Sequence, residues 1–252
     1  MVRSRDNVLV KRLRRLAEQP TAYRKLGQFW IEGDHLCQAA LLHGAMPQMA
    51  VFSETFYPRA PAQLREAAPA NVLMADDLFA GLGALPSPAG FGFVMALAEV
   101  LPARSDVFTV VLDRIQDAGN VGSILRSAAA FGFGQVLALS GTAGLWSPKV
   151  LRSAMGAHFA LHLVEGLGHA DVARLGLPLV VTSSHTGVLL EQQVLPKPCA
   201  WVFGHEGQGV SADLISTASV AVRIGQPGGE ESLNVAAAAA ICLHASARGL
   251  GP

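Results

Sequence analysis

The chain has 252 residues, 51% hydrophobic and 15% charged, which is enough for one large domain or two ordinary ones with a substantial core. Lysine plus arginine equals aspartate plus glutamate at 19 each, which argues against a protein that binds nucleic acid through overall basicity. No apolar run reaches the roughly 18 residues of a membrane span and no signal peptide is visible, so we expect a cytoplasmic protein.

The first 25 residues have an uneven charge distribution. Eight basic side chains stand there against only Asp6 and Glu18. Over the whole chain arginines outnumber lysines fifteen to four, and the planar guanidinium group suits contact with phosphate. This basic leader predicts either a nucleic-acid contact or a solvated helix.

Residues up to 102 predict a small α/β domain. Short apolar runs alternate with helical patterns, and the glycine- and proline-rich stretch Gly81–Gly92 separates the last two runs. A break at Leu101–Asp106 marks the boundary, so we expect domains at 1–102 and 103–252. The expected strands are Phe29–Ile31, Met49–Phe52, Val72–Met74 and Phe93–Leu97, with helices from Asp34 to Leu42 and near Ala62–Ala68.

The second domain alternates apolar runs with helical stretches, which is typical of a parallel sheet covered by helices. We expect Ser232 to cap the last helix, because its hydroxyl can accept an early backbone N–H. An alanine-rich stretch, Ala236–Ala240, then favours a helix that packs closely. The expected strands are Val107–Leu112, Gln135–Leu139, Ala160–Val164, Leu179–Thr182, Ala200–Phe203 and Val220–Ile224, with a helix over Val121–Phe131.

Three segments carry polar residues and glycines next to expected strands. They are Asn120–Arg126, Gly204–Gly209 and Ser232–Val235. Open α/β sheets bind ligands at the carboxyl ends of their strands, which makes these segments the candidate site. The glycines at 204–209 are spaced GxxGxG, so neither the GxGxxG dinucleotide loop nor a phosphate loop with its lysine is present.

The sequence offers little for a metal or a disulfide. His158 and His162 have a spacing that can bind metal on a helix, but the second falls in an expected strand, so we predict no metal. The cysteines Cys37, Cys199 and Cys242 form no CxxC pair, and we expect buried, reduced thiols.

Taken together, the three segments resemble the SpoU (TrmH) family of RNA 2′-O-ribose methyltransferases, members of the SPOUT superfamily. The resemblance covers about residues 107–248, with a further family-like stretch at Arg152–Ala157. The sequence departs from the family at Gly225-Gln226, where many members have Pro-Met, and at Ala236, where many have Ser. The matching residues are Asn120, Gly122, Ile124, Arg126, Ala128, Phe131 and Gly132, then Gly204, Glu206, Gly207 and Gly209, then Ser232, Leu233, Asn234 and Val235.

This resemblance implies a fold and a cofactor. The second domain would contain a deep trefoil knot that holds S-adenosylmethionine in a bent form. Backbone groups at Gly204, Ile224 and Leu233, with Gly207 and Gly209 in the same loop, would bind the cofactor, because glycine lets the backbone approach a ligand closely. The stretch Phe29–Gly33 resembles a small RNA-binding domain, similar to certain ribosomal proteins, that many members carry in front.

The resemblance also implies catalytic roles. Arg126 is the family's proposed catalytic residue, but keeping an arginine neutral at pH 7 costs about 9 kcal/mol. We therefore expect Arg126 to orient a phosphate and stabilise the developing alkoxide. Proton removal is left to Glu206, a phosphate oxygen or water. Asn120 either anchors the ribose or the motif loop, or caps the following helix. Ser232 and Asn234 either position RNA or cap the last helix.

The leading hypothesis is methylation of a ribose 2′-oxygen in structured RNA, with ribosomal RNA favoured over transfer RNA. The resemblance also implies a homodimer formed through the knotted domain. Two alternatives are a non-catalytic RNA-binding or ribosome assembly factor with this fold, and a methyltransferase acting on a small molecule. Arg152 could contact phosphate or form a structural ion pair.

Overall fold

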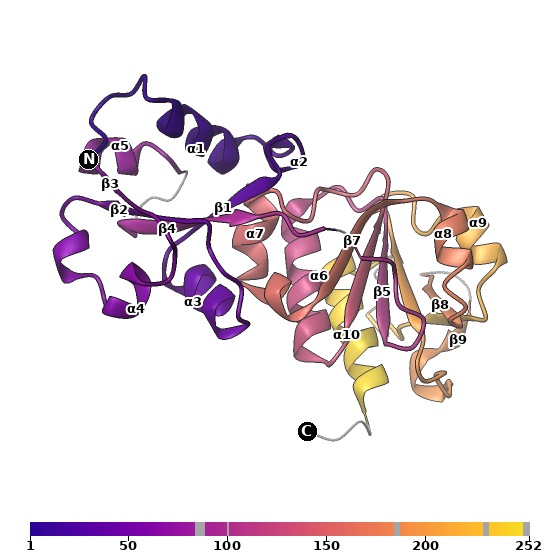
Figure 1. Cartoon of the computed structure of the whole chain (residues 1–252). Helices are drawn as coiled ribbons and strands as arrows, with labels where there is room; N and C mark the ends of the chain where they lie inside the picture. The colour runs from indigo at the N-terminus through magenta and orange to yellow at the C-terminus, as the bar shows by residue number, and fades with distance from the viewer. Residues whose placement is uncertain (84–88, 100, 184–186, 229–231, 249–252) are drawn as a thin grey trace. The chain divides into compact units, whose positions relative to one another are not determined.

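The computed structural model describes residues 1–83, 89–99, 101–183, 187–228 and 232–248. The chain divides into two compact units, and most of their helices and strands are labelled in Figure 1. The first unit consists of Met1–Glu99 and Trp146–Phe159, and the second of Val100–Leu145 and Ala160–Pro252. Among the described residues, no helix has both the length and the apolar character that crossing a bilayer requires.

The first unit is built on a mixed four-stranded sheet with the strand order β1-β4-β2-β3. Strand β4 runs antiparallel to both β1 and β2, while β2 and β3 are parallel. The strands are β1 (Gln28–Glu32), β2 (Met49–Ser53), β3 (Asn71–Met74) and β4 (Phe91–Ala96), and the helices are α1 (Val8–Glu18), α2 (Ala22–Leu26), α3 (Asp34–Leu42), α4 (Ala62–Arg65), α5 (Asp76–Ala80) and α7 (Pro148–Ala154).

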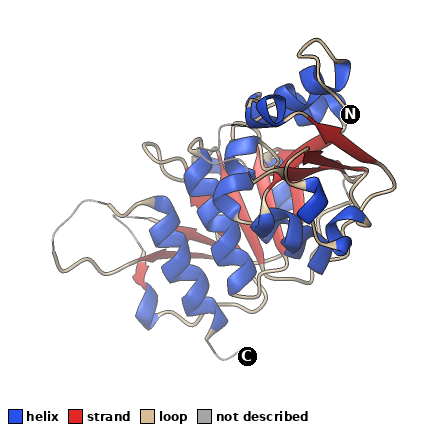
Figure 2. Ribbon diagram, turned by 90° about the vertical axis from the view of Figure 1, so that its left-hand side faces the viewer, coloured by secondary structure: helices blue, strands red, loops and turns tan. Residues whose placement is uncertain are grey.

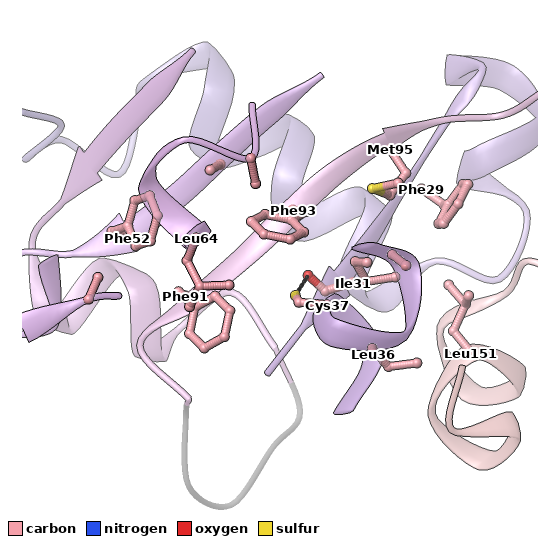
Figure 3. Packing of buried hydrophobic residues seen from close by; sticks show 14 of the residues in the cluster. Phe29, Ile31, Leu36, Cys37, Phe52, Leu64, Phe91, Phe93, Met95 and Leu151 are labelled. Carbon is pink, nitrogen blue, oxygen red and sulfur yellow. Dashed lines mark hydrogen bonds between the residues drawn. The ribbon is translucent and has the colours of Figure 1, made fainter. Parts of the chain in front are cut away.

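Alternation along β1 divides the core of this unit between the two faces of the sheet. Phe29 and Ile31 belong to one buried cluster, and Trp30 between them belongs to the other, because successive side chains on a strand point to opposite faces. Figure 3 shows the first cluster, in which the thiol of Cys37 donates to the carbonyl of Ile31. The second cluster contains the apolar side of α1, including Leu13. Within the basic leader, α1 is therefore an amphipathic helix whose apolar side forms part of the core.

The segment Trp146–Phe159 corrects the expected unbroken domain 103–252. Its helix α7 packs in the first unit, where Leu151 is 2% exposed within the first cluster (Figure 3). The ring centroids of Phe29 and Trp146 lie 4.5 Å apart. Apolar contacts far apart in the chain decide where this segment packs, and the local sequence pattern carries no sign of them.

The second unit is built on a seven-stranded sheet with the order β7-β6-β5-β10-β8-β11-β9, in which every pairing is parallel. The central strands β5, β6 and β10 are buried at every residue, as expected for strands covered on both faces. The strands are β5 (Thr109–Asp113), β6 (Gln135–Leu139), β7 (His162–Leu167), β8 (Leu179–Thr182), β9 (Val188–Leu189), β10 (Ala200–Gly204) and β11 (Val220–Arg223), and the helices are α6 (Ala118–Ala130), α8 (His169–Ala173), α9 (Ala212–Ser216) and α10 (Val235–Ala247).

Helices cover both faces of this sheet, with α6 and α10 on one side and α8 and α9 on the other (Figure 1), and Figure 2 shows helices in front of its strands. Val111 and Val202 cluster on one face with Val172 of α8 and Leu214 of α9. Trp201 points the other way, and its indole N–H donates to the hydroxyl of Ser246 on α10, at 2.7 Å. Helices α6 and α10 pack against each other, so the C-terminal helix lies beside the helix of the first motif. The prediction of a parallel sheet covered by helices is confirmed.

Element bounds differ from the predictions in a few places. The expected helix near 62–68 ends at Arg65, and the expected strand 160–164 lies instead at His162–Leu167. The two-residue strand β9 was not expected, because its length leaves too few residues to show alternation.

Candidate active site

The three candidate segments each follow a strand of the second unit. Strand β5 ends at Asp113, β10 at Gly204 and β11 at Arg223. Because these strands are parallel members of one sheet, their carboxyl ends lie at one edge.

Glu206 is the hydrogen-bond centre of this edge. Its carboxylate accepts the backbone N–H groups of Gln116 at 3.3 Å and Asp117 at 3.2 Å, and the side-chain amide of Asn120 at 3.1 Å. Burial raises the pKa of Glu206, but these hydrogen bonds outweigh it, and the pKa lies below its usual value. Glu206 thus binds the second motif to the first and is held as a carboxylate.

The third motif joins the same network through Asn120 and Asn234. The amide of Asn234 donates to the side-chain oxygen of Asn120 at 3.0 Å. The side-chain oxygen of Asn234 in turn accepts the backbone N–H groups of Ala236 and Ala237 at the start of α10. A continuous chain of hydrogen bonds therefore runs from Glu206 through Asn120 and Asn234 to the N-terminus of the last helix.

The structure settles two questions about helix caps. Asn234, not Ser232, caps α10, so the expected Ser232 cap is wrong. Asp117 caps α6 by accepting the N–H of Asn120 at 2.8 Å, so Asn120 is not the cap. Helix α10 begins at Val235, so its cap falls two residues beyond Ser232, which is exposed.

The glycine loop closes on itself. A Cβ added at Gly204 would lie 2.2 Å from both the carbonyl carbon of Gly209 and the backbone nitrogen of Val210. Gly209 has φ +68° and donates its N–H to the carbonyl of His205 at 2.8 Å. The Nδ1 of His205 accepts the backbone N–H groups of Gly207 and Gln208, which gives this histidine a role within the loop. Gly204 is thus required by the loop's own backbone.

A buried carboxylate that was missed from the sequence secures this loop to β5. Asp113 is fully buried and accepts the backbone N–H of Ser211 at 2.7 Å and the Nε–H of Arg114 at 2.8 Å. Burial raises the pKa of Asp113, but these partners outweigh it and leave the pKa below its usual value. Arg114, at φ 61°, also donates to the side chain of Gln208 at 2.9 Å. The one available signal was an aspartate ending an apolar strand.

Arg126 lies on the exposed side of α6 and is not brought into direct contact with Glu206. The guanidinium of Arg126 forms no hydrogen bond or ion pair with any residue that the structure describes. Arg126 is therefore a cation that the folded chain leaves accessible on the helix of the first motif.

The proposed cofactor residues beyond the glycine loop flank the third motif. Ile224 directly follows β11, and Leu233 is 39% exposed next to the helix cap Asn234. The side-chain oxygen of Gln226 is buried without a hydrogen-bond partner among the described residues. A buried, unsatisfied acceptor of this kind calls for a donor from a ligand or water.

The remaining predicted residues lie elsewhere. Arg152 is on α7 in the first unit. His158 packs 5.0 Å from the ring of Trp146, and the Nε2 of His162 lies 3.0 Å from the carbonyl oxygen of Pro102. Over the described part of the chain, no three His, Cys, Asp or Glu side chains form a group able to hold a metal ion.

Comparison with known proteins places these features in a family. Residues 107–244 match the model of the SpoU rRNA Methylase family. The 23S rRNA (guanosine(2553)-2′-O)-methyltransferase RlmP of Bacillus subtilis is 31% identical over 224 residues, which cover 87% of this chain and 88% of that protein.

Two solved structures share the fold along nearly the whole chain. A TrmH-family protein of Porphyromonas gingivalis superposes with a TM-score of 0.81 at 30% identity, covering 94% of this chain and 95% of that one. The SpoU methyltransferase AviRb of Streptomyces viridochromogenes was solved in complex with the cofactor AdoMet. It superposes with a TM-score of 0.86 at 25% identity, covering 96% of this chain and 97% of that one.

Proposed function

This chain belongs to the SpoU rRNA Methylase family, and from that premise we propose that it transfers a methyl group from S-adenosylmethionine to a ribose 2′-oxygen of structured RNA. The observation that carries the proposal is the hydrogen-bond chain Glu206–Asn120–Asn234, which unites the three family motifs at one edge of the sheet. Ribosomal RNA is favoured over transfer RNA because RlmP, the relative that matches 87% of this chain, acts on 23S rRNA.

The residues of this edge fit the proposed cofactor. S-adenosylmethionine, when bound, supplies an electrophilic methyl group on a positively charged sulfur. Backbone groups at Gly204, Ile224 and Leu233 would hold its adenosine, with the exposed Leu233 side chain offering an apolar surface to the base. The buried oxygen of Gln226, two residues after Ile224, would accept one of the cofactor's N–H or O–H donors.

We assign the chemistry to Arg126 and positioning to the network. The guanidinium of Arg126 would contact a phosphate of the RNA and stabilise negative charge on the 2′-oxygen as its proton leaves. Glu206 has a lowered pKa and already accepts three hydrogen bonds, so it is a poor proton acceptor and is assigned to positioning the first motif. The proton is taken by water or a phosphate oxygen. Ser232, exposed beside the cap, is assigned to RNA contact.

The family also supports finer proposals about architecture. The second unit forms a trefoil knot that surrounds the cofactor, and two copies of the chain form a homodimer through this unit. The first unit and its basic leader supply RNA affinity, similar to certain ribosomal proteins, and the enzyme works in the cytoplasm. Size-exclusion chromatography with light scattering tests the dimer, since a monomer mass at micromolar concentration would contradict it.

The function is tested by incubating the purified chain with methyl-labelled S-adenosylmethionine and RNA that lacks ribose methylation, with 23S, 16S and transfer RNA separated. Labelling of ribosomal RNA by the wild type and its loss in Arg126→Ala support the proposal. Arg174→Ala is the matched control, because Arg174 is an exposed arginine of the same unit whose ion pair with Asp171 lies on the surface. An unlabelled wild type would support the assembly-factor alternative instead.

A further inference from the structure

A cavity of about 340 Å³ opens within the first unit, and none of its described lining residues belongs to the three motifs. Its walls come from the end of α1, from β1, from the start of α3 and from α7. Trp30, Leu36 and Leu151 form apolar walls, and the last two lie at the edge of the first cluster in Figure 3. This volume falls in the range of sites for small organic groups.

Charged side chains give the cavity its chemistry, since Glu32, Asp34 and Arg152 all line it, together with His35. Glu32 ends β1 and is partly buried, and its carboxylate accepts the indole N–H of Trp30 at the long distance of 3.5 Å. Arg152 on α7 lines the same cavity, and its charge acts on Glu32. Burial is the largest effect and raises the pKa of Glu32 above its usual value, and the opposing effects of Trp30, the backbone of Ala89 and Arg152 offset it only in part.

The helix that supplies one wall is also the basic leader. Ala17 of α1 lines the cavity, and the same helix carries Lys11, Arg12, Arg14 and Arg15. The Nε–H of Arg14 donates to the carbonyl of Gly81 at 3.2 Å, two residues before the cavity wall at Gly83. One wall of this apolar, carboxylate-containing cavity therefore belongs to a strongly basic helix, which suits a ligand with a flat ring and a phosphate chain.

We propose that this cavity receives an unpaired guanine base of the substrate RNA, with Glu32 accepting the N1–H and N2–H donors of the base edge. Guanine alone among the RNA bases presents two adjacent N–H donors on that edge, and a carboxylate presents two acceptors at matching spacing. Arg152 and the cations of α1 contact the flanking phosphates. This inference rests on the proposed function only in taking RNA as the ligand.

The test measures binding of three fluorescein-labelled RNA heptamers, UUUGUUU, UUUIUUU and UUUAUUU, to the full chain at fixed salt by fluorescence anisotropy. Inosine lacks only the N2 amino group. We expect the guanosine heptamer to bind roughly ten-fold more tightly than the inosine heptamer, which loses one hydrogen bond to the carboxylate, and to exceed the adenosine heptamer by more, because adenine loses both. Glu32→Gln should abolish this preference, and Ala17→Leu, which fills the cavity, should reduce all three to the same residual affinity.

Glu18→Gln is the matched control, because Glu18 is an exposed carboxylate one residue from the cavity wall, and it should keep the preference. Circular dichroism checks that each variant is folded. Equal affinity for the three heptamers in the wild type, or a preserved preference in Glu32→Gln, would overturn the proposal. If the wild type methylates RNA but binds the three heptamers equally, only this inference is refuted. If it prefers the guanosine heptamer but transfers no methyl group, only the proposed function is refuted.

Discussion

Replacing Gly204 by alanine tests whether the glycine loop is closed by its own backbone. The added methyl carbon would lie 2.2 Å from two backbone atoms of Gly209 and Val210, where real contacts stay beyond 3.0 Å. Backbone atoms cannot rotate away as a side chain can, so the loop must move. Overpacking of this kind costs about 1–3 kcal/mol, and each kcal/mol lowers Tm by about 2–4 °C in a chain of this size.

The neighbouring glycines provide graded controls. Gly207 has no atom closer than 3.8 Å to an added Cβ and is not in the left-handed region, so Gly207→Ala should change stability by less than about 0.5 kcal/mol. Gly209 has room but φ +68°, so Gly209→Ala should cost about 1–2 kcal/mol through strain alone.

The assay for this series is thermal unfolding, together with calorimetric binding of S-adenosylmethionine. We expect the order of stability Gly207→Ala, Gly209→Ala, Gly204→Ala, from most to least stable, and we expect cofactor binding to weaken most in Gly204→Ala. If Gly204→Ala melts and binds like Gly207→Ala, the loop does not close as described and the reasoning is refuted.

Three further predictions follow from the same site and from the core. Asn120→Asp places a second carboxylate beside Glu206 and removes an amide donor, so urea unfolding should show a loss of about 1–2 kcal/mol. The pKa of Asp113 is lower in the folded chain than in the unfolded chain, so ionised Asp113 stabilises the fold above its unfolded pKa, and this stabilisation is lost as the pH falls through the folded pKa. The free energy of unfolding below about pH 4 should therefore drop less steeply in Asp113→Asn than in the wild type. Burial raises the pKa of Cys199 to about 11 and that of Cys242 to about 12, so both thiols should resist a disulfide reagent at pH 8 until the chain unfolds; rapid reaction in the native state would contradict their burial.

The sequence predicted the second unit better than the first. Strands such as Gln135–Leu139 are continuous apolar runs, and such runs between helical stretches indicate a buried parallel sheet with few alternatives. The position of α7 could not be read in this way, because its apolar residues, such as Leu151, have the same pattern whichever sheet they pack against.

Within the candidate site, the motifs gave the residues but not their connections. The sequence allows Asn120 to act as an anchor or as a cap, and only the structure shows its hydrogen bonds to Glu206 and Asn234. Asp113 was missed altogether, because one carboxylate at the end of a strand gives no sign of the partner 98 residues along the chain that it binds. Such contacts depend on tertiary structure, which periodicity does not encode.

The central claim, methyl transfer to a ribose 2′-oxygen, is tested most directly by the chemistry of the labelled product. A 2′-O-methyl group blocks the attack of that oxygen on the neighbouring phosphate, so alkaline hydrolysis of labelled RNA should leave the label in an uncleaved dinucleotide. The wild type should give this product from RNA and Arg126→Ala should not. Label recovered in a single nucleotide, as from a methylated base, would contradict the account.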